Sequence, residues 1–247
     1  MKREVRQTGL HALPDGRRIA FRQVAGIQPA IVFLPGYQSD MAGSKAIALF
    51  EWAERNRRGC LLLDYSGCGE SSGEFAEGTL TRWCDEVVAL SEARLGGQVI
   101  LVGSSMGGWL MLLAARRLGE RVAAMVGIAA APDFTDWGFD DRQKAQLAAG
   151  KTLRQDNPYG PEPTLVHPGF WADGESLHVL DGAIPFDGPV RLLHGLDDSD
   201  VPPEISLRLA AALRSQDVQV TLVKGGDHRL SREQDIALLL RTVAELT

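Results

Sequence analysis

The strongest chemical signal in this sequence of 247 residues is a serine inside a Gly-x-Ser-x-Gly pentapeptide. Ser105 is the central residue of Gly103–Gly107, which follows the apolar run Val99–Val102 and precedes a helix-like apolar segment from Gly108. The order of strand, sharp turn and helix is the setting in which a serine is exposed as a nucleophile. Glycines on both sides allow the strained turn and the close packing that it needs. We predict that Ser105 is a nucleophile.

A serine hydroxyl becomes a good nucleophile only when a base removes its proton, and histidine is the usual base. His228 closes the Gly-rich segment Lys224–His228, directly after the apolar run Val218–Val223. None of the other four histidines stands on such a loop after the last apolar run. We therefore predict that His228 is the base.

The base in turn needs an acid that orients it. Asp197, Asp198 and Asp200 all follow the apolar run Pro189–His194. Serine, acid and histidine thus occur in the chain order of one known class of hydrolytic site, each after a strand. The residues alone leave the choice among the three acids open.

Each residue also has a structural interpretation. Ser105 could cap the helix that follows it, and Asp198 could cap a helix that begins near Pro202, since both types are common N-caps. His228 could be an ordinary surface histidine. The coincidence of three groups in the right order and at corresponding positions favours the catalytic interpretation.

The composition excludes several classes of function. Twenty-six basic and 32 acidic residues give a net charge of −6, which is not the electrostatic signature of a nucleic-acid-binding protein. The longest apolar run, Val122–Ala131, is too short to cross a bilayer, so we expect no integral membrane segment. The start, Met1–Gln7, is polar and no apolar segment follows it, so we expect a cytoplasmic location.

The three cysteines Cys60, Cys68 and Cys84 are widely spaced and form no Cys-x-x-Cys pair. A disulfide framework and a zinc site are therefore not expected, and we predict no metal and no cofactor. A reactive Cys68 near the active site is a weaker interpretation than a bystander thiol.

Alternating apolar and helical segments predict an α/β fold with a mostly parallel, doubly wound sheet. An antiparallel hairpin around Pro14–Gly16 opens the chain, because Asp-Gly between two short strands favours a tight turn. Short apolar runs then alternate with amphipathic segments. The expected strands are 30–34, 60–64, 99–102, 122–128, 189–194 and 218–223, and the expected helices are 44–56, 80–95, one from 108 and one near 202.

This alternation stops between residues 133 and 187, where we find no clear strand. A long irregular segment inside a compact domain is commonly a functional lid. We predict a core domain of residues 1–132 and 188–247, with 133–187 inserted as a cap over the active site. Most of the aromatic residues concentrated there should pack the cap against the core, with one or two lining an acyl pocket: Phe134, Trp137, Phe139, Tyr159, Phe170 and Trp171.

Two loops complete the expected site. Leu34–Asp40 follows the first parallel strand, from which one donor of the oxyanion hole should come. We assign this donor to the backbone N–H of Tyr37 and the second to the backbone N–H of Met106. Asp64–Gly73 is Gly-rich but lacks the Gly-Lys-Ser/Thr of a phosphate-binding loop, so we predict that it supports the rim of the site and binds no nucleotide.

The assembled motifs resemble the α/β-hydrolase superfamily and, within it, the abhydrolase-domain mitochondrial palmitoyl-protein thioesterase and acyl-glucuronide esterase family. The resemblance is carried by LPGYQSDMAGSKA, LDYSGCGESSG, ILVGSSMGGWLML, RLLHGLDDSDVP and DHRLS. It implies the α/β-hydrolase fold and a triad of Ser105, Asp198 and His228, and thereby selects Asp198 over its neighbours. The match weakens over residues 133–187, so the resemblance says less about the identity of the substrate than about the chemistry.

The expected reaction is hydrolysis of acyl thioesters or esters through an acyl-enzyme intermediate. The resemblance favours an acyl-protein thioesterase; the alternatives are a small-molecule carboxylesterase, including an acyl-glucuronide esterase, and a catalytically inactive ligand-binding protein of the same fold. A peptidase is less favoured. The expected partners are small-molecule or lipid-acyl substrates, acylated proteins included.

Overall fold

The computed structural model describes residues 8–158 and 160–247. Met1–Gln7 and Tyr159, which entered the sequence predictions, lie outside the described residues. One sheet of eight strands, in the order β1-β2-β4-β3-β5-β6-β9-β10, forms the centre of the molecule. Its strands are β1 Gly9–Ala12, β2 Arg18–Val24, β3 Ile27–Leu34, β4 Arg58–Leu63, β5 Val99–Ser104, β6 Val122–Ile128, β9 Val190–Gly195 and β10 Val218–Val223.

The six strands from β4 to β10 in this order are parallel to their neighbours, whereas β1 and β2 are antiparallel at one edge. The predicted hairpin is confirmed: Gly9–Ala12 pairs with Arg18–Phe21 around a turn in which Gly16 has a φ of 89°. The central strands are buried on both faces. Their continuous apolar runs are therefore the pattern expected of a covered parallel sheet.

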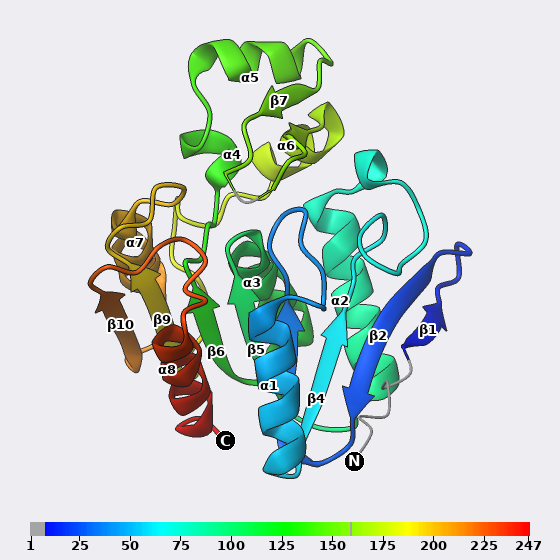
Figure 1. The fold of residues 1–247 in the computed structure, drawn as a ribbon, viewed down its shortest axis with the longest axis vertical. Helices are drawn as coiled ribbons and strands as arrows, with labels where there is room; N and C mark the ends of the chain where they lie inside the picture. Colours follow the sequence, from blue (N-terminus) through cyan, green and yellow to red (C-terminus); the bar gives the residue numbers. More distant parts are fainter. Residues whose placement is uncertain (1–7, 159) are drawn as a thin grey trace.

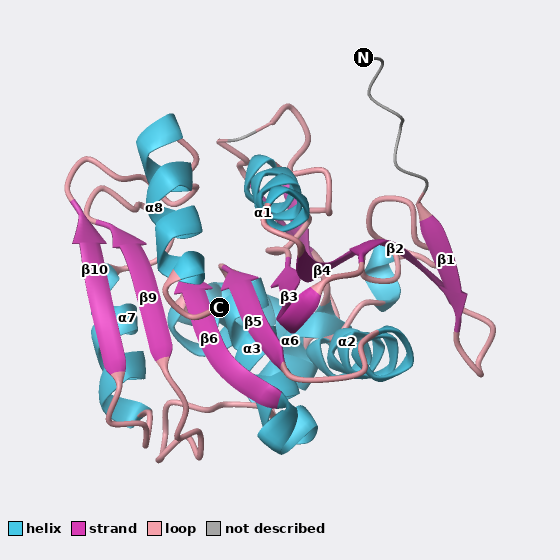
Figure 2. Ribbon diagram, turned by 90° about the horizontal axis from the view of Figure 1, so that it is seen from below, coloured by secondary structure: helices cyan, strands magenta, loops and turns pink. Residues whose placement is uncertain are grey.

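Helices cover both faces of the sheet (Figure 2). On one face, α1 (Ser44–Arg55) and α8 (Glu233–Ala244) bury residues such as Phe50 and Val243. On the other, α2 (Leu80–Arg94), α3 (Met106–Leu118) and α7 (Pro203–Ala212) enclose a larger core that includes Trp83 and Trp109. Two single-turn helices, η1 (Phe75–Glu77) and η2 (Gly119–Arg121), lie in the connections. The α/β prediction is confirmed.

The chain between β6 and β9 rises above the upper ends of the strands, where β6 leads into it and where β5 leads into α3 (Figure 1). It contains the helices α4 (Phe134–Trp137), α5 (Asp141–Ala148) and α6 (Pro168–Glu175). It also contains β7 (Leu153–Gln155) and β8 (Thr164–Val166), which form an antiparallel pair. The expectation that this segment holds no strand was wrong, because strands of three residues are too short to show an alternating pattern.

Asp133 joins the two ends of this inserted segment. It has a φ of 58°, and its buried carboxylate accepts hydrogen bonds from the backbone N–H groups of Val179 and Leu180 at 2.8–3.1 Å. Phe170 anchors the middle of the segment, since its buried ring lies 4.7 Å from the ring of Tyr37. Among the described residues, no helix is long and apolar enough to cross a membrane.

Candidate active site

Ser105 lies on a strained turn between β5 and α3. Its φ of 55° and ψ of −121° are rarely adopted by residues with a side chain. The turn is fixed at both ends, because the Ser105 N–H donates to the carbonyl of Ile128 at 2.9 Å and its carbonyl accepts from Gly108 at 2.8 Å. Gly107 is required sterically: a Cβ there would lie 2.1 Å from the carbonyl oxygen of Leu34. The turn therefore presents the serine hydroxyl outward at the upper edge of the sheet.

A hydrogen-bonded chain connects Ser105 to His228 and Asp198. His228 Nε2 lies 3.0 Å from Ser105 Oγ, and His228 Nδ1 lies 2.9 Å from Asp198 Oδ2. Since an ionised carboxylate only accepts, Nδ1 carries the ring proton and Nε2 accepts from the serine hydroxyl. The Asp198 side chain is fully buried, while the His228 side chain keeps 14% of its surface exposed. The structure thus brings together three residues that are far apart in the sequence.

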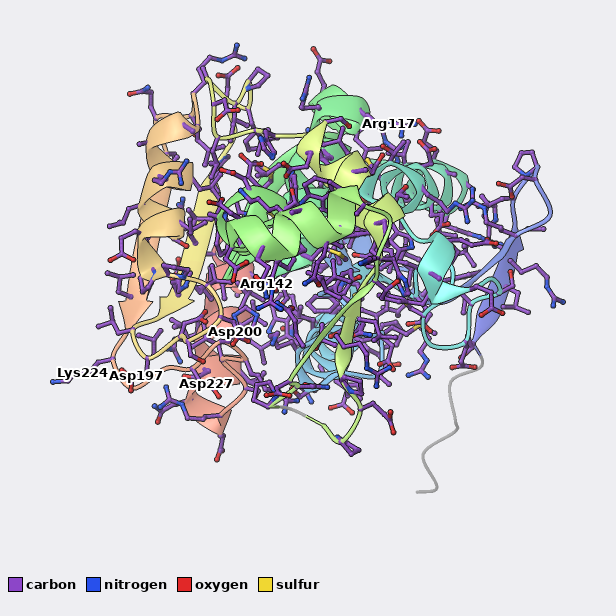
Figure 3. The ribbon with its side chains drawn as sticks, turned by 90° about the horizontal axis from the view of Figure 1, so that it is seen from above. Arg117, Arg142, Asp197, Asp200, Lys224 and Asp227 are labelled. Carbon is purple, nitrogen blue, oxygen red and sulfur yellow. The ribbon has the colours of Figure 1, made fainter. Side chains whose placement is uncertain are left out.

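Of the other two acids of the loop, Asp200 lines the cavity that contains Ser105 and His228. Asp197 and Asp200 are exposed, and Asp197 lies at the outer edge of the molecule near Lys224 (Figure 3). Asp198 caps no helix, because its Oδ1 accepts from the N–H groups of Asp200 and Val201 within its own loop. Of the three acids, Asp198 is the one that hydrogen-bonds to His228.

The surroundings of Asp198 keep it ionised. Burial by itself raises the pKa of this carboxyl, but hydrogen bonds from His194 and His228 outweigh burial and hold the pKa well below its usual range. The sequence indicated no role in the site for His194, yet its Nε2 lies 3.2 Å from Asp198 Oδ2. The available signal was its spacing, four residues before the acid and at the end of a buried strand.

Tyr37 and Met106, the expected oxyanion donors, both line the cavity that contains Ser105. Among the described residues, neither backbone N–H has a protein acceptor. Gly36 lies close to the serine turn, since a Cβ on it would lie 3.3 Å from the carbonyl oxygen of Ser104 and 3.4 Å from Ser105 Cβ. The side chain of Tyr37 makes a different contact, because its hydroxyl donates to the carbonyl of Leu165 in β8 at 2.8 Å.

The loop that carries Tyr37 is braced by Asp64. The Asp64 carboxylate accepts from the N–H of Met41 at 2.7 Å and from the N–H of Glu70 at 2.8 Å, and so ties together two loops at the rim. Gly69 must lack a side chain, because a Cβ there would lie 2.2 Å from Asp64 Oδ2. This geometry fits the supporting role predicted for Asp64–Gly73.

A cavity of about 480 Å³ opens beside Ser105 and His228. The inserted segment supplies an aromatic wall of Phe134, Trp137 and Phe139. Polar residues of the lining come from the loop after β3, the start of α1, the β7–β8 connection and the start of β8: Gln38, Ser39, Asp40, Ser44, Lys45, Asn157 and Thr164. The described cavity can therefore accept an apolar group next to a polar one.

The remaining aromatic residues of the inserted segment pack inside the protein. Phe170 contacts Tyr37 and Trp83, and Trp171 donates its indole N–H to the carbonyl of Thr135 at 3.2 Å. We expected most of these aromatic residues to pack and one or two to line the pocket. Of the five that the structure describes, three line the cavity and two pack, so the expected proportion was wrong.

The three cysteines are buried and unpaired. Burial raises the pKa of Cys68 to about 12 and that of Cys84 to about 11, and it raises the pKa of Cys60 as well. A thiol with a pKa this high is almost entirely protonated at neutral pH and is a poor nucleophile. Cys68 lies within the rim loop Asp64–Gly73, and its raised pKa supports the predicted bystander role.

Residues 31–242 match the Alpha/beta hydrolase family, and the chain belongs to that family. The palmitoyl-protein thioesterase ABHD10, mitochondrial, from Homo sapiens is 37% identical over 237 residues, which are 94% of this chain and 78% of the relative. The predicted resemblance is thereby confirmed.

Solved structures agree. Alpha/beta hydrolase domain-containing protein 10 from mouse superposes with a TM-score of 0.90 at 35% identity, covering 97% of this chain and 98% of its own. A protein from Agrobacterium vitis S4 also superposes with a TM-score of 0.90, at 38% identity, covering 98% of this chain and 99% of its own. The family and these relatives support a hydrolytic activity. Because the curated relatives are named as mitochondrial, the cytoplasmic location expected from the sequence stays a prediction.

Proposed function

We propose that the protein is a serine hydrolase that cleaves acyl thioesters or esters. The observation that carries the proposal is the hydrogen-bonded chain from Asp198 Oδ2 through the His228 ring to Ser105 Oγ, with separations of 2.9 Å and 3.0 Å. A nucleophile within reach of a base, and a base oriented by a buried acid, is the arrangement that nucleophilic acyl transfer requires.

The reaction has two steps. In the first, His228 Nε2 takes the hydroxyl proton while Ser105 Oγ attacks the substrate carbonyl, and the imidazolium then returns the proton to the departing thiolate or alkoxide. In the second, His228 activates a water that cleaves the acyl-enzyme. The backbone N–H groups of Tyr37 and Met106 stabilise the oxyanion in both steps, and each donor contributes about 3 kcal/mol.

The inserted segment, residues 133–187, acts in this proposal as a cap that shapes the acyl site. Phe134, Trp137 and Phe139 form the one strongly aromatic wall of the described cavity, so the acyl chain lies against them. The thioesterase relatives support a thioester as the substrate, including an acyl group on a protein cysteine. The polar lining of the same cavity, which includes Gln38 and Lys45, favours as a second candidate the hydrolysis of compact esters with polar alcohols.

A hydrolysis panel tests the proposal. Acyl thioesters and p-nitrophenyl esters of matched chain length are offered to the wild type and to Ser105→Ala. The account expects turnover of at least one series by the wild type and none above background by the variant. Full activity in Ser105→Ala would refute it. A preference for either series at matched chain length decides between the thioesterase and the carboxylesterase.

A further inference from the structure

Four hydrogen-bond donors surround the carboxylate of Asp198, and one of them belongs to a residue outside the proposed triad. Oδ1 accepts from the backbone N–H groups of Asp200 and Val201, both at 2.9 Å. Oδ2 lies 2.9 Å from His228 Nδ1 and 3.2 Å from His194 Nε2. His194 therefore shares with His228 the oxygen on which the orientation of His228 depends.

The His194 ring has a definite hydrogen-bonding state. Its Nε2 hydrogen-bonds to the carbonyl of Val201 at 2.9 Å, so this nitrogen carries a proton, and the same nitrogen lies 3.2 Å from Asp198 Oδ2 as a second, more distant acceptor. Its Nδ1 lies 2.7 Å from the hydroxyl of Ser206, which can donate to it. The neutral ring with its proton on Nε2 satisfies all of these contacts. The ring is fully buried, so no solvent competes for them.

The surroundings of His194 are rigid. His194 lies in β9, an inner strand of the sheet paired with β6 and β10, and Ser206 lies in α7, which packs on that sheet. Asp198, by contrast, lies on the loop that follows β9. A donor fixed by a strand and a helix can therefore define the orientation of a carboxylate that a loop alone would leave less well determined.

We propose that His194 is a positioning residue: its Nε2–H fixes Asp198 Oδ2 in the orientation that accepts the Nδ1–H of His228. The proposal rests on the assignment of Asp198, His228 and Ser105 as the acyl-transfer triad. It makes the acid part of a longer chain that runs from Ser206 through His194, Asp198 and His228 to Ser105.

Two consequences follow from this arrangement. Without His194, the side chain of Asp198 loses one of the two donors on Oδ2 and can rotate away from His228. The His194 hydrogen bond is also one of the interactions that lower the pKa of Asp198 against the effect of burial, so its loss favours the protonated acid, which orients His228 poorly.

A matched pair of substitutions tests the proposal. His194→Met removes the donor with little change in volume, whereas the side-chain amide of His194→Gln can still donate to Asp198. We expect His194→Met to lower kcat by about 10- to 100-fold with KM nearly unchanged, and His194→Gln to recover most of that loss. Rates are normalised to the number of sites that a fluorophosphonate titrates, so only folded, reactive protein is compared.

A spectroscopic measurement separates positioning from a general loss of structure. The His228 Nδ1–H proton is deshielded by its bond to the carboxylate and is observed by proton NMR. We expect this resonance to be lost or shifted upfield in His194→Met and to persist in His194→Gln. Should both variants fail to fold, Ser206→Ala, which removes the donor to His194 Nδ1, is expected to lower kcat in the same direction by a smaller factor.

The outcomes distinguish the two proposals. A wild type that turns over neither thioesters nor esters contradicts the proposed function. An active wild type with a His194→Met variant of equal kcat and an unchanged His228 resonance contradicts the positioning role alone. If neither His194 variant folds, an unchanged kcat in Ser206→Ala contradicts the positioning role of His194.

Discussion

The hydroxyl of Tyr37 donates a hydrogen bond to the carbonyl of Leu165 at 2.8 Å, and this contact joins the loop beside Ser105 to β8 of the inserted segment. The backbone N–H of the same tyrosine borders the cavity. One residue therefore connects the expected oxyanion donor to the inserted segment, residues of which line the cavity. Burial raises the pKa of the phenol, so the hydroxyl keeps its proton and remains a donor at physiological pH.

Tyr37→Phe removes this hydrogen bond while leaving the backbone N–H and the ring in place. Because a neutral hydrogen bond contributes about 0.5–1.5 kcal/mol, we expect kcat/KM to fall by about two- to tenfold. Hydrogen exchange at β7 and β8 should become faster in the variant. Unchanged exchange together with unchanged kcat/KM would show that the contact does not couple the two segments.

Trp137→Ala removes an indole from the aromatic wall and so enlarges the cavity. The acyl-length optimum should move to longer chains, and each newly accommodated methylene should raise kcat/KM by about fourfold. The p-nitrophenyl ester series measures this shift. Trp171→Ala is the matched control, since that indole packs against Thr135 within the inserted segment and does not line the cavity. If the acyl-length optimum of Trp137→Ala equals that of the wild type, the acyl group does not lie against this aromatic wall.

Asp198→Asn replaces the acceptor for His228 by an amide that can stabilise the wrong ring tautomer. We expect kcat to fall by about ten-thousand-fold, as in other triads of this type. Asp197→Asn is the control, because this exposed side chain lies outside the hydrogen-bonded chain. Steady-state kinetics of both variants on one substrate show which aspartate orients His228. A severe loss of kcat in Asp197→Asn with a mild loss in Asp198→Asn would reverse the assignment.

The stability of the protein should depend on the ionisation of Asp198. Its pKa is held well below the usual range in the folded protein, so the unfolded chain binds more protons and the stabilisation is present above the unfolded pKa of about 3.9. As the pH falls below that value toward the folded pKa, the stabilisation is lost. Urea unfolding of the wild type and Asp198→Asn should show a difference in free energy that is constant above about pH 5 and shrinks at about pH 3. A difference that does not change with pH would contradict the ionised state.

Much of this arrangement is predictable from the sequence, because local rules govern it. Continuous apolar runs such as Val99–Val102 predict buried parallel strands, and the glycines around Ser105 predict the strained turn between strand and helix. The order of Ser105, the acids and His228 predicts a site at one edge of the sheet. The strand and turn signals depend on residues close together in the chain, whereas the last depends on the order of residues that are far apart in it.

Other features depend on contacts across the fold, which the sequence does not give directly. Burial separates Asp198 from Asp197, whose residue type and loop are the same. His194 contacts the acid only because β9 and the loop after it bring the two side chains together. The strands β7 and β8 are three residues long and are stabilised by pairing with each other, not by an alternating pattern.

The central claim, that Ser105 is a nucleophile activated by His228, is tested most directly by covalent labelling. The intact mass of the protein is measured after reaction with a serine-directed fluorophosphonate, for the wild type, Ser105→Ala and His228→Ala. The account predicts one adduct on the wild type, located at Ser105, no adduct on Ser105→Ala and much slower labelling of His228→Ala. A folded wild type that takes up no label, or a Ser105→Ala variant labelled as fast as the wild type, would contradict it and favour a ligand-binding protein without this catalytic serine.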